Sequence, residues 1–108
     1  MFTFVALDVS LELVTAVAAP LARIRSRDTD LARQLRRAVQ SVALNIAEGL
    51  GRDGGHRRQS FRHAYGSLRE ARTALKVAAA FGYLRTDEAA AADRTADRLG
   101  GLIWPFAR

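Results

Sequence analysis

The chain has no cysteine among its 108 residues, so disulfide bonds and thiolate metal sites are excluded. It also lacks a signal-peptide pattern, because the stretch MFTFVALDVSLEL has no basic leading region and carries Asp8 and Glu12 within its apolar run. No uninterrupted apolar segment approaches the roughly 18–20 residues that cross a bilayer. We therefore expect a cytoplasmic protein that makes no membrane contact. The length predicts a single domain over residues 1–108.

Motifs that carry catalysis or bind cofactors are also missing. The sequence contains no P-loop, no zinc-ligand spacing and no nucleophile–base pair. Glu48 and Glu70 are the carboxylates available for acid–base or metal chemistry, yet neither is followed by a histidine three residues on. A lone His63 adds little to such a site. We expect no enzymatic activity, no cofactor and no metal, with a hydrolase or metal-binding bundle as the rival hypothesis that metal analysis would test.

Acidic residues are scarce in the middle of the chain. Residues 31–85 hold eleven basic and three acidic side chains, whereas residues 1–30 and 86–108 each hold three basic and four acidic ones. The overall net charge of +6 is therefore concentrated in one part of the sequence. This concentration favours an anionic partner. The alternative is an arginine-rich composition of the kind that a GC-rich genome produces without selection for binding.

Strand-like alternation is absent, and apolar residues recur at helical spacing along most of the chain. A first helix carries one apolar row, with a kink or break near Pro20: Leu7, Leu11, Val14, Ala18 and Leu21. The residues 25–30 that follow include a cap for the second helix, at Asp28, Thr29 or Asp30.

The second helix follows the row Leu31, Leu35, Ala38 and Val42, and should end at Gly49 or Gly51. Glycines then predict a loop over residues 49–55. The third helix carries the row Phe61, Ala64, Leu68, Ala71, Leu75 and Ala78, and stops at Gly82. The fourth is capped by Thr86, carries the row Ala89, Ala92, Ala96, Leu99, Ile103 and Phe106, and ends near Pro105. Because short loops join antiparallel neighbours, the sequence predicts an all-α, antiparallel up-down four-helix bundle.

Polar residues border the apolar rows of the second and third helices. Steps of three and four connect Gln34, Arg37, Ser41, Asn45, Glu48 and Arg52 on one helix, and Ser60, His63, Ser67 and Glu70 on the other. We predict that a structural polar network joins the two helices and fixes their register; its members are Arg37, Ser41, Asn45, Glu48, Ser67 and Glu70. The alternative is that these groups form a ligand site.

A basic row runs along the third helix at steps of four and three, away from its apolar row: Arg58, Arg62, Tyr65, Arg69, Arg72 and Lys76. Arg36, Arg52 and Arg57 widen it. Such a row matches a phosphate backbone, and Tyr65 offers a ring for stacking on an unpaired base. We predict that these residues bind nucleic acid. The alternatives are an idle surface, or pairing with acidic residues of a neighbouring subunit: Asp87, Glu88, Asp93 and Asp97.

Three segments carry a family resemblance: QLRRAVQSVALNIAEGLGR, FRHAYGSLREARTAL and GYL. Together they resemble the 23S rRNA intervening-sequence proteins, a family of small bacterial four-helix bundles related to the accessory variability proteins of diversity-generating retroelements. The similarity covers roughly residues 5–105. One position departs from the family pattern, because Ala43 stands where a proline is common. The resemblance implies a ring-shaped homo-oligomer, typically a pentamer, with a role associated with nucleic acid.

Residues and resemblance together lead to one functional hypothesis. We expect a non-enzymatic, oligomeric four-helix bundle whose basic surface binds nucleic acid, with RNA favoured over DNA, or a nucleoprotein complex. No base-reading motif is present, so contacts should follow the backbone or the shape of the nucleic acid. The alternative is a protein-interaction scaffold whose arginines bind an acidic partner or a reverse transcriptase.

Overall fold

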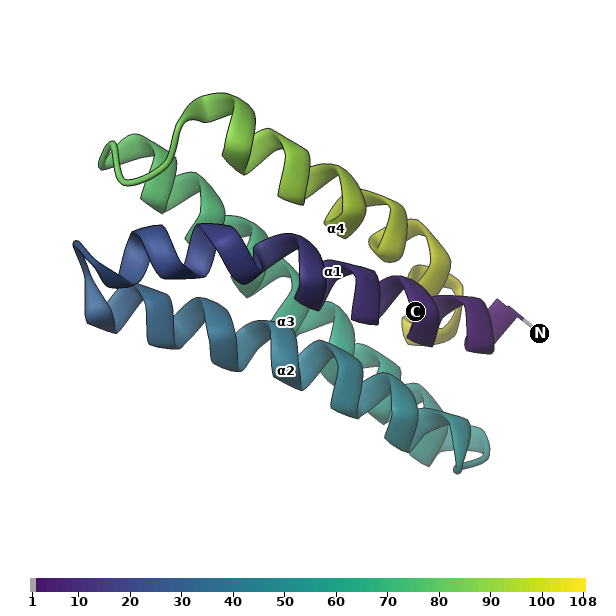
Figure 1. Ribbon diagram of the computed structural model, residues 1–108. Coiled ribbons are helices and arrows are strands. Elements are labelled where there is room, and N and C mark those ends of the chain that lie inside the picture. Colours follow the sequence, from purple (N-terminus) through teal and green to yellow (C-terminus); the bar gives the residue numbers. More distant parts are fainter. Residues whose placement is uncertain (1) are drawn as a thin grey trace.

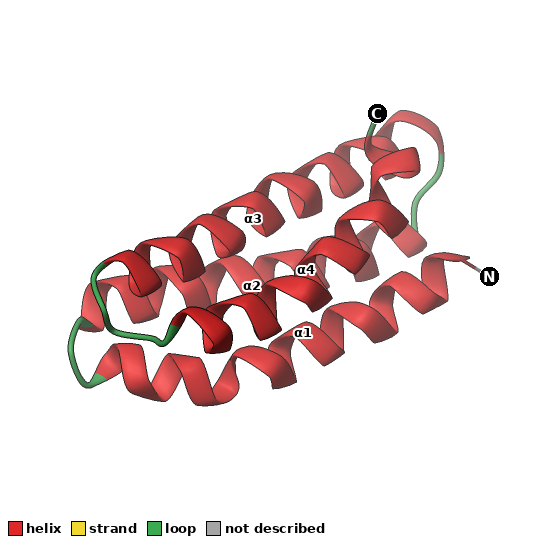
Figure 2. Cartoon of the chain, turned by 90° about the horizontal axis from the view of Figure 1, so that it is seen from above, coloured by secondary structure: helices red, strands yellow, loops and turns green. Residues whose placement is uncertain are grey.

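A computed structural model describes residues 2–108, with side chains from Val5 onward. Four helices follow one another along the chain: α1 (Phe2–Arg25), α2 (Thr29–Leu50), α3 (Gly54–Ala80) and α4 (Thr86–Ala107). The α1–α2 and α3–α4 connections lie at one end of the molecule, and the α2–α3 connection at the other (Figure 1). Short loops join the long helices (Figure 2). The predicted all-α, up-down four-helix bundle is confirmed.

The helix ends follow local capping rules, with two differences from the sequence prediction. Asp28 caps α2 as expected, because its carboxylate accepts the backbone N–H of Leu31 at 3.0 Å. The predicted loop over 49–55 is shorter, since α2 continues to Leu50 and α3 begins at Gly54. Thr86 is the first residue of α4 and not its cap. Arg85 holds the cap position, and its N–H donates to the Glu88 carboxylate at 3.1 Å.

Neither proline ends its helix. Helix α1 continues through Pro20 to Arg25, and α4 continues through Pro105 to Ala107. Of the kink or break expected near Pro20, the break is therefore wrong. A proline inside a helix loses one backbone hydrogen bond. The side chain of Pro20 is buried against the bundle, so its packing offsets that loss.

The apolar rows predicted for α2, α3 and α4 lie in the core, with Phe106 at the end of α4 only partly buried, whereas most of the row predicted for α1 does not. Leu11 is 52% exposed and Val14 is 39% exposed. The core takes a different row of α1: Ala6, Val9, Leu13, Val17 and Ile24. Helix α1 therefore has two apolar faces, and we call Leu7, Leu11, Val14, Ala18 and Leu21 its outer row.

The two apolar faces explain why α1 resembles a membrane span by composition. The segment Val5–Arg25 is long and apolar enough to cross a bilayer, with a mean hydropathy of 1.7. About a third of that segment is buried inside the bundle. By length and composition alone, the core helix of a bundle passes the same test.

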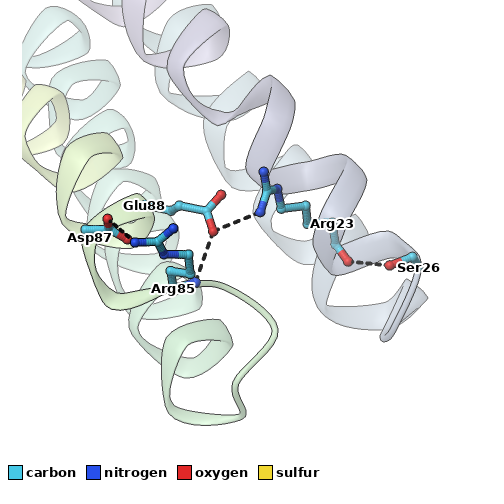
Figure 3. A network of polar contacts seen from close by, with 5 residues as sticks. All are labelled: Arg23, Ser26, Arg85, Asp87 and Glu88. Carbon is cyan, nitrogen blue, oxygen red and sulfur yellow. Dashed lines mark hydrogen bonds and ion pairs between the residues drawn. The ribbon is translucent and has the colours of Figure 1, made fainter.

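A polar network fastens α1 to α4 at the end where the α1–α2 and α3–α4 loops lie (Figure 3). Arg23 and the backbone N–H of Arg85 both meet one carboxylate oxygen of Glu88 at 3.1 Å. The Arg85 guanidinium also pairs with Asp87 at 3.0 Å. Exposed pairs of this kind contribute only about 0–1 kcal/mol each. Arg23 and Arg85 therefore already have anionic partners within the chain.

Candidate nucleic-acid interface

A groove runs along the outer seam between α2 and α3. The helices are antiparallel, which places Ser41 opposite Ser67 with 2.8 Å between their Oγ atoms. From that pair the groove extends toward Leu31 and Val77 and encloses about 890 Å³. Its lining mixes polar and apolar groups and includes two guanidinium groups: Leu31, Gln34, Arg37, Ala38, Ser41, Gly66, Ser67, Arg69, Glu70, Thr73, Ala74 and Val77.

The predicted polar network is only partly assembled. Asn45 donates from Nδ2 to the backbone oxygen of Ser41 at 2.8 Å and to its Oγ at 3.0 Å. Together with the Ser41–Ser67 bond, this makes a half-buried chain across the helix interface. Each such bond contributes about 0.5–1.5 kcal/mol, and together they hold the register of α2 against α3.

The remaining members of the predicted network lie outside that chain. Glu48 pairs with Arg52, which lies just beyond the end of α2, at 2.6 Å. Arg37 and Glu70 are exposed and line the groove. The reason is geometric: the polar row borders the core without entering it, so its long side chains extend to solvent while its short ones meet at the interface. The prediction of one network of six is therefore corrected to a network of three beside an open groove.

The basic row faces α4 over part of its length. Arg72 makes two hydrogen bonds to Asp93, at 2.8 and 3.0 Å, and lies 3.4 Å from Asp97. Arg62 donates from Nε to the backbone oxygen of Ala107, at 2.8 Å, where the end of α4 favours a cation. Both arginines thus tie α3 to α4 within one chain, and Asp93 and Asp97 have partners without a neighbouring subunit.

These contacts also set the charge state of the α3–α4 seam. The hydrogen bonds from Arg72 lower the pKa of the Asp93 carboxyl below its ordinary value, and the positive charge of Lys76 acts in the same direction. The same hydrogen bond raises the pKa of Arg72. The pair therefore stays ionised at neutral pH and leaves Arg72 little capacity for a phosphate.

The two aromatic-facing members of the predicted site are packed within the chain. Tyr65 lies against Trp104, with 5.1 Å between ring centroids. The guanidinium of Arg57 lies over Phe61 and Phe106, at 5.9 and 5.7 Å from the ring centroids. Such cation–π contacts contribute about 0.5–1 kcal/mol at exposed sites and more when desolvated. Tyr65 and Arg57 therefore contribute to the bundle itself.

Four arginines on α2 and α3 have no side-chain ion pair, hydrogen bond or cation–π contact with any of residues 5–108: Arg36, Arg37, Arg58 and Arg69. Arg37 and Arg69 come from different helices and line the same groove. The sequence predicts Arg37 as a member of the polar network. Its spacing on α2 also fits a position that faces solvent, which is where the structure has it. The arrangement offers two fork-shaped donors across one groove, which suits phosphate or carboxylate oxygens.

Metal ligands do not gather at this site. Within the part of the chain that the structure describes, no group of three or more His, Asp or Glu side chains could hold a metal ion. Glu48, Glu70 and His63, the residues of the rival metal hypothesis, are not brought together as such a group.

Fold and groove define a small all-α bundle protein with an outer groove lined in part by arginine. The sequence model of the 23S rRNA-intervening sequence protein family matches residues 5–104, and the chain belongs to this family. This confirms the resemblance. A crystal structure of a protein of unknown function from the S23 ribosomal protein family of Bacteroides thetaiotaomicron has the same fold, with a TM-score of 0.84 and 18% identity over 99% of this chain and 98% of that chain. No curated protein matches the chain. Neither family description names an enzymatic activity.

Proposed function

We propose that this protein is a non-enzymatic, cytoplasmic nucleic-acid-binding protein that takes RNA in preference to DNA. One observation supports this most directly: Arg37 and Arg69 line a common groove and neither is paired with a described residue. One guanidinium group can bind two phosphate oxygens at once, and each phosphate that is neutralised releases counterions. The family description, which refers to 23S rRNA, favours RNA.

The proposed surface is narrower than the full basic row. Arg62 and Arg72 hold α4, and Arg52 pairs with Glu48. The binding face therefore comprises the outer side of α2 and α3, with Arg37, Arg58 and Arg69 as its cations, whereas Arg36 lines a different groove, between α1 and α2. Because no described feature reads base edges, the contacts position a phosphate backbone and affinity should depend strongly on salt.

A salt series of binding to fluorescent RNA and to DNA of equal length tests this proposal. We expect a linear fall of log affinity with log salt, and the double variant Arg37→Glu/Arg69→Glu should lose at least about tenfold in affinity. Arg94→Glu/Arg108→Glu is the control, because it makes the same change in net charge on α4 and the C-terminus. Equal losses in both variants, or no measurable RNA binding by the parent protein, would refute the proposal.

One observation favours the alternative of a protein partner. Glu70 lies in the groove beside the two arginines, and a carboxylate there repels phosphates. The groove therefore also suits a protein partner, such as a reverse transcriptase, whose acidic side chains meet the two arginines while a basic side chain meets Glu70. Weak RNA binding that does not change on Arg37→Glu/Arg69→Glu would favour this scaffold function.

We also propose that the protein is a homo-oligomer, with a pentamer as the size favoured by the resemblance, and that the outer row of α1 contacts a second copy. An apolar groove of about 300 Å³ lies between α1 and α2, lined in part by Val14, Leu21 and Val39. Arg25 and Arg36 line the same groove, whereas Asp8 is exposed near the start of α1. The acidic start of one α1 thus complements the basic rim of the next copy, and the contact removes exposed apolar surface from water.

Leu11→Glu/Val14→Glu should convert the oligomer to a monomer of 11.8 kDa while the helix content is retained. The charges would enter the apolar contact without a partner. Light scattering after size exclusion gives the mass, and circular dichroism gives the helix content. Trp104→Glu, which changes a half-exposed side chain on the α3–α4 side, should stay oligomeric. A monomeric parent protein would contradict the proposal.

A further inference from the structure

The row of α3 that lines the groove continues to an exposed aromatic ring. Glu70, Thr73 and Val77 line the groove, and Phe81 follows Val77 by four residues. The N–H of Phe81 donates to the backbone oxygen of Val77 at 2.9 Å, so Phe81 keeps the helical direction of that row. Its side chain is 64% exposed. The groove therefore leads along α3 to an open ring at the end of the bundle.

This ring is held in place by its neighbours. Phe81 stacks on Tyr83, with 5.3 Å between centroids and 21° between ring planes. The positive φ of Gly82, 79°, lets the chain turn so that the Tyr83 N–H donates to the backbone oxygen of Ala78 at 2.9 Å. The guanidinium of Arg27 lies 5.5 Å from the centroid of the Tyr83 ring. We call Arg27, Phe81 and Tyr83 the aromatic end.

We propose that the aromatic end stacks an unpaired base of single-stranded RNA whose phosphates follow the α2–α3 groove. This inference rests on the proposed RNA binding and adds the kind of RNA. A base in a duplex is covered on both faces, whereas an unpaired base can stack on an exposed ring whatever its identity. A ring already fixed by Tyr83 loses little conformational freedom on binding.

The distances along α3 suit a short strand. Phe81 lies twelve positions beyond Arg69 (69 to 81), or about 18 Å at a rise of about 1.5 Å per residue. That length accommodates about five stacked nucleotides at roughly 3.4 Å each. The groove arginine thus meets the backbone while the aromatic end meets a base further along the same strand. Arg27 adds a cation beside that base.

Comparison of single-stranded and duplex RNA tests this inference. The probes are a fluorescent single-stranded RNA of twelve nucleotides and the duplex of the same length. Phe81→Ala should weaken single-strand binding about tenfold, within the range for one lost base–aromatic stack, and leave duplex binding within about twofold. Phe81→Trp keeps an aromatic ring and should therefore bind the single strand with about the parent affinity. The bound base should quench the fluorescence of the new indole. Because Phe81 is exposed, all variants should melt at nearly the parent temperature.

Failure of this inference is distinguishable from failure of the proposed function. Suppose that Arg37→Glu/Arg69→Glu abolishes RNA binding while Phe81→Ala changes neither the single-strand nor the duplex affinity. The proposed RNA binding by the groove is then supported, and the aromatic end does not stack a base. Equal losses for single strand and duplex would overturn the inference as well. A parent protein that binds neither RNA would remove both proposals. Trp104→Ala is the control, since Trp104 is 47% exposed and contacts Tyr65 on the α3–α4 side, outside the residues that line the groove.

Discussion

Phe61→Ala is expected to lower the free energy of unfolding by about 3–5 kcal/mol. The Phe61 side chain is fully buried, and its ring lies 5.2 Å from that of Phe106, centroid to centroid. The guanidinium of Arg57 lies over both rings, and the backbone of Gly49 packs closely against Phe61. Alanine would leave a cavity where α2, α3 and α4 meet. Urea unfolding followed by circular dichroism measures the loss, which is a large part of the 5–15 kcal/mol typical of a domain.

Phe81→Ala is the matched control for this prediction. It removes the same ring from an exposed position and should change the unfolding free energy by no more than about 0.5 kcal/mol. A loss below about 1 kcal/mol for Phe61→Ala would contradict the tight packing described for its ring. A reduced slope of free energy against urea would instead indicate that the variant is no longer fully folded.

The sequence predicts three of the four buried rows because α2, α3 and α4 are apolar on one side only. For α2, the residues opposite Leu35 and Val42 are mostly charged, so spacing alone identifies the inner face. Helix α1 is apolar on two sides, and local spacing does not distinguish them. The choice of Val9 and Leu13 over Leu11 depends on how α1 meets α2 and α4, which is a tertiary property.

The candidate site could be predicted as a set of helix faces but not as a set of contacts. Spacing correctly places Arg62, Arg69 and Arg72 along one side of α3. Which of them remains available depends on residues about twenty to forty-five positions away, because Asp93 and Ala107 on α4 bind two of the three. The relevant information lies in the packing of α3 on α4.

Phe81 illustrates a second limit of sequence reasoning. It lies outside the apolar row of α3 and directly before Gly82, so the sequence alone places it only at the end of the helix. The available signal was its spacing of four from Val77, which continues the outer row. This spacing indicates a functional position only once the structure shows that the groove runs along the same side of α3.

Gly49→Val is expected to destabilise the protein by about 3 kcal/mol, although glycine is ordinarily a poor residue inside a helix. Gly49 is helical and buried, in the segment NIAEG that contributes to the family resemblance. A Cβ at this position would lie 2.8 Å from Cε2 and 3.0 Å from Cδ2 of Phe61, and 3.4 Å from Cβ of Ser60. The ring is fully buried and lies against Phe106, so we expect the larger side chain to force α2 and α3 apart. Urea unfolding measures the loss.

Gly101→Ala is the control for this steric argument, because a Cβ on that helical glycine meets nothing within 4 Å. It should stabilise the protein by about 0.5–1 kcal/mol through helix propensity alone. Gly49→Ala should destabilise the parent protein. It should destabilise a Phe61→Leu variant less, because the smaller leucine side chain leaves room for the added methyl group. If Gly49→Ala instead stabilised the parent as Gly101→Ala does, close contact between α2 and Phe61 would not be the reason for the glycine. The loss of stability and its relief by Phe61→Leu would together assign this part of the family pattern to helix packing, and leave the groove residues as the part that serves binding.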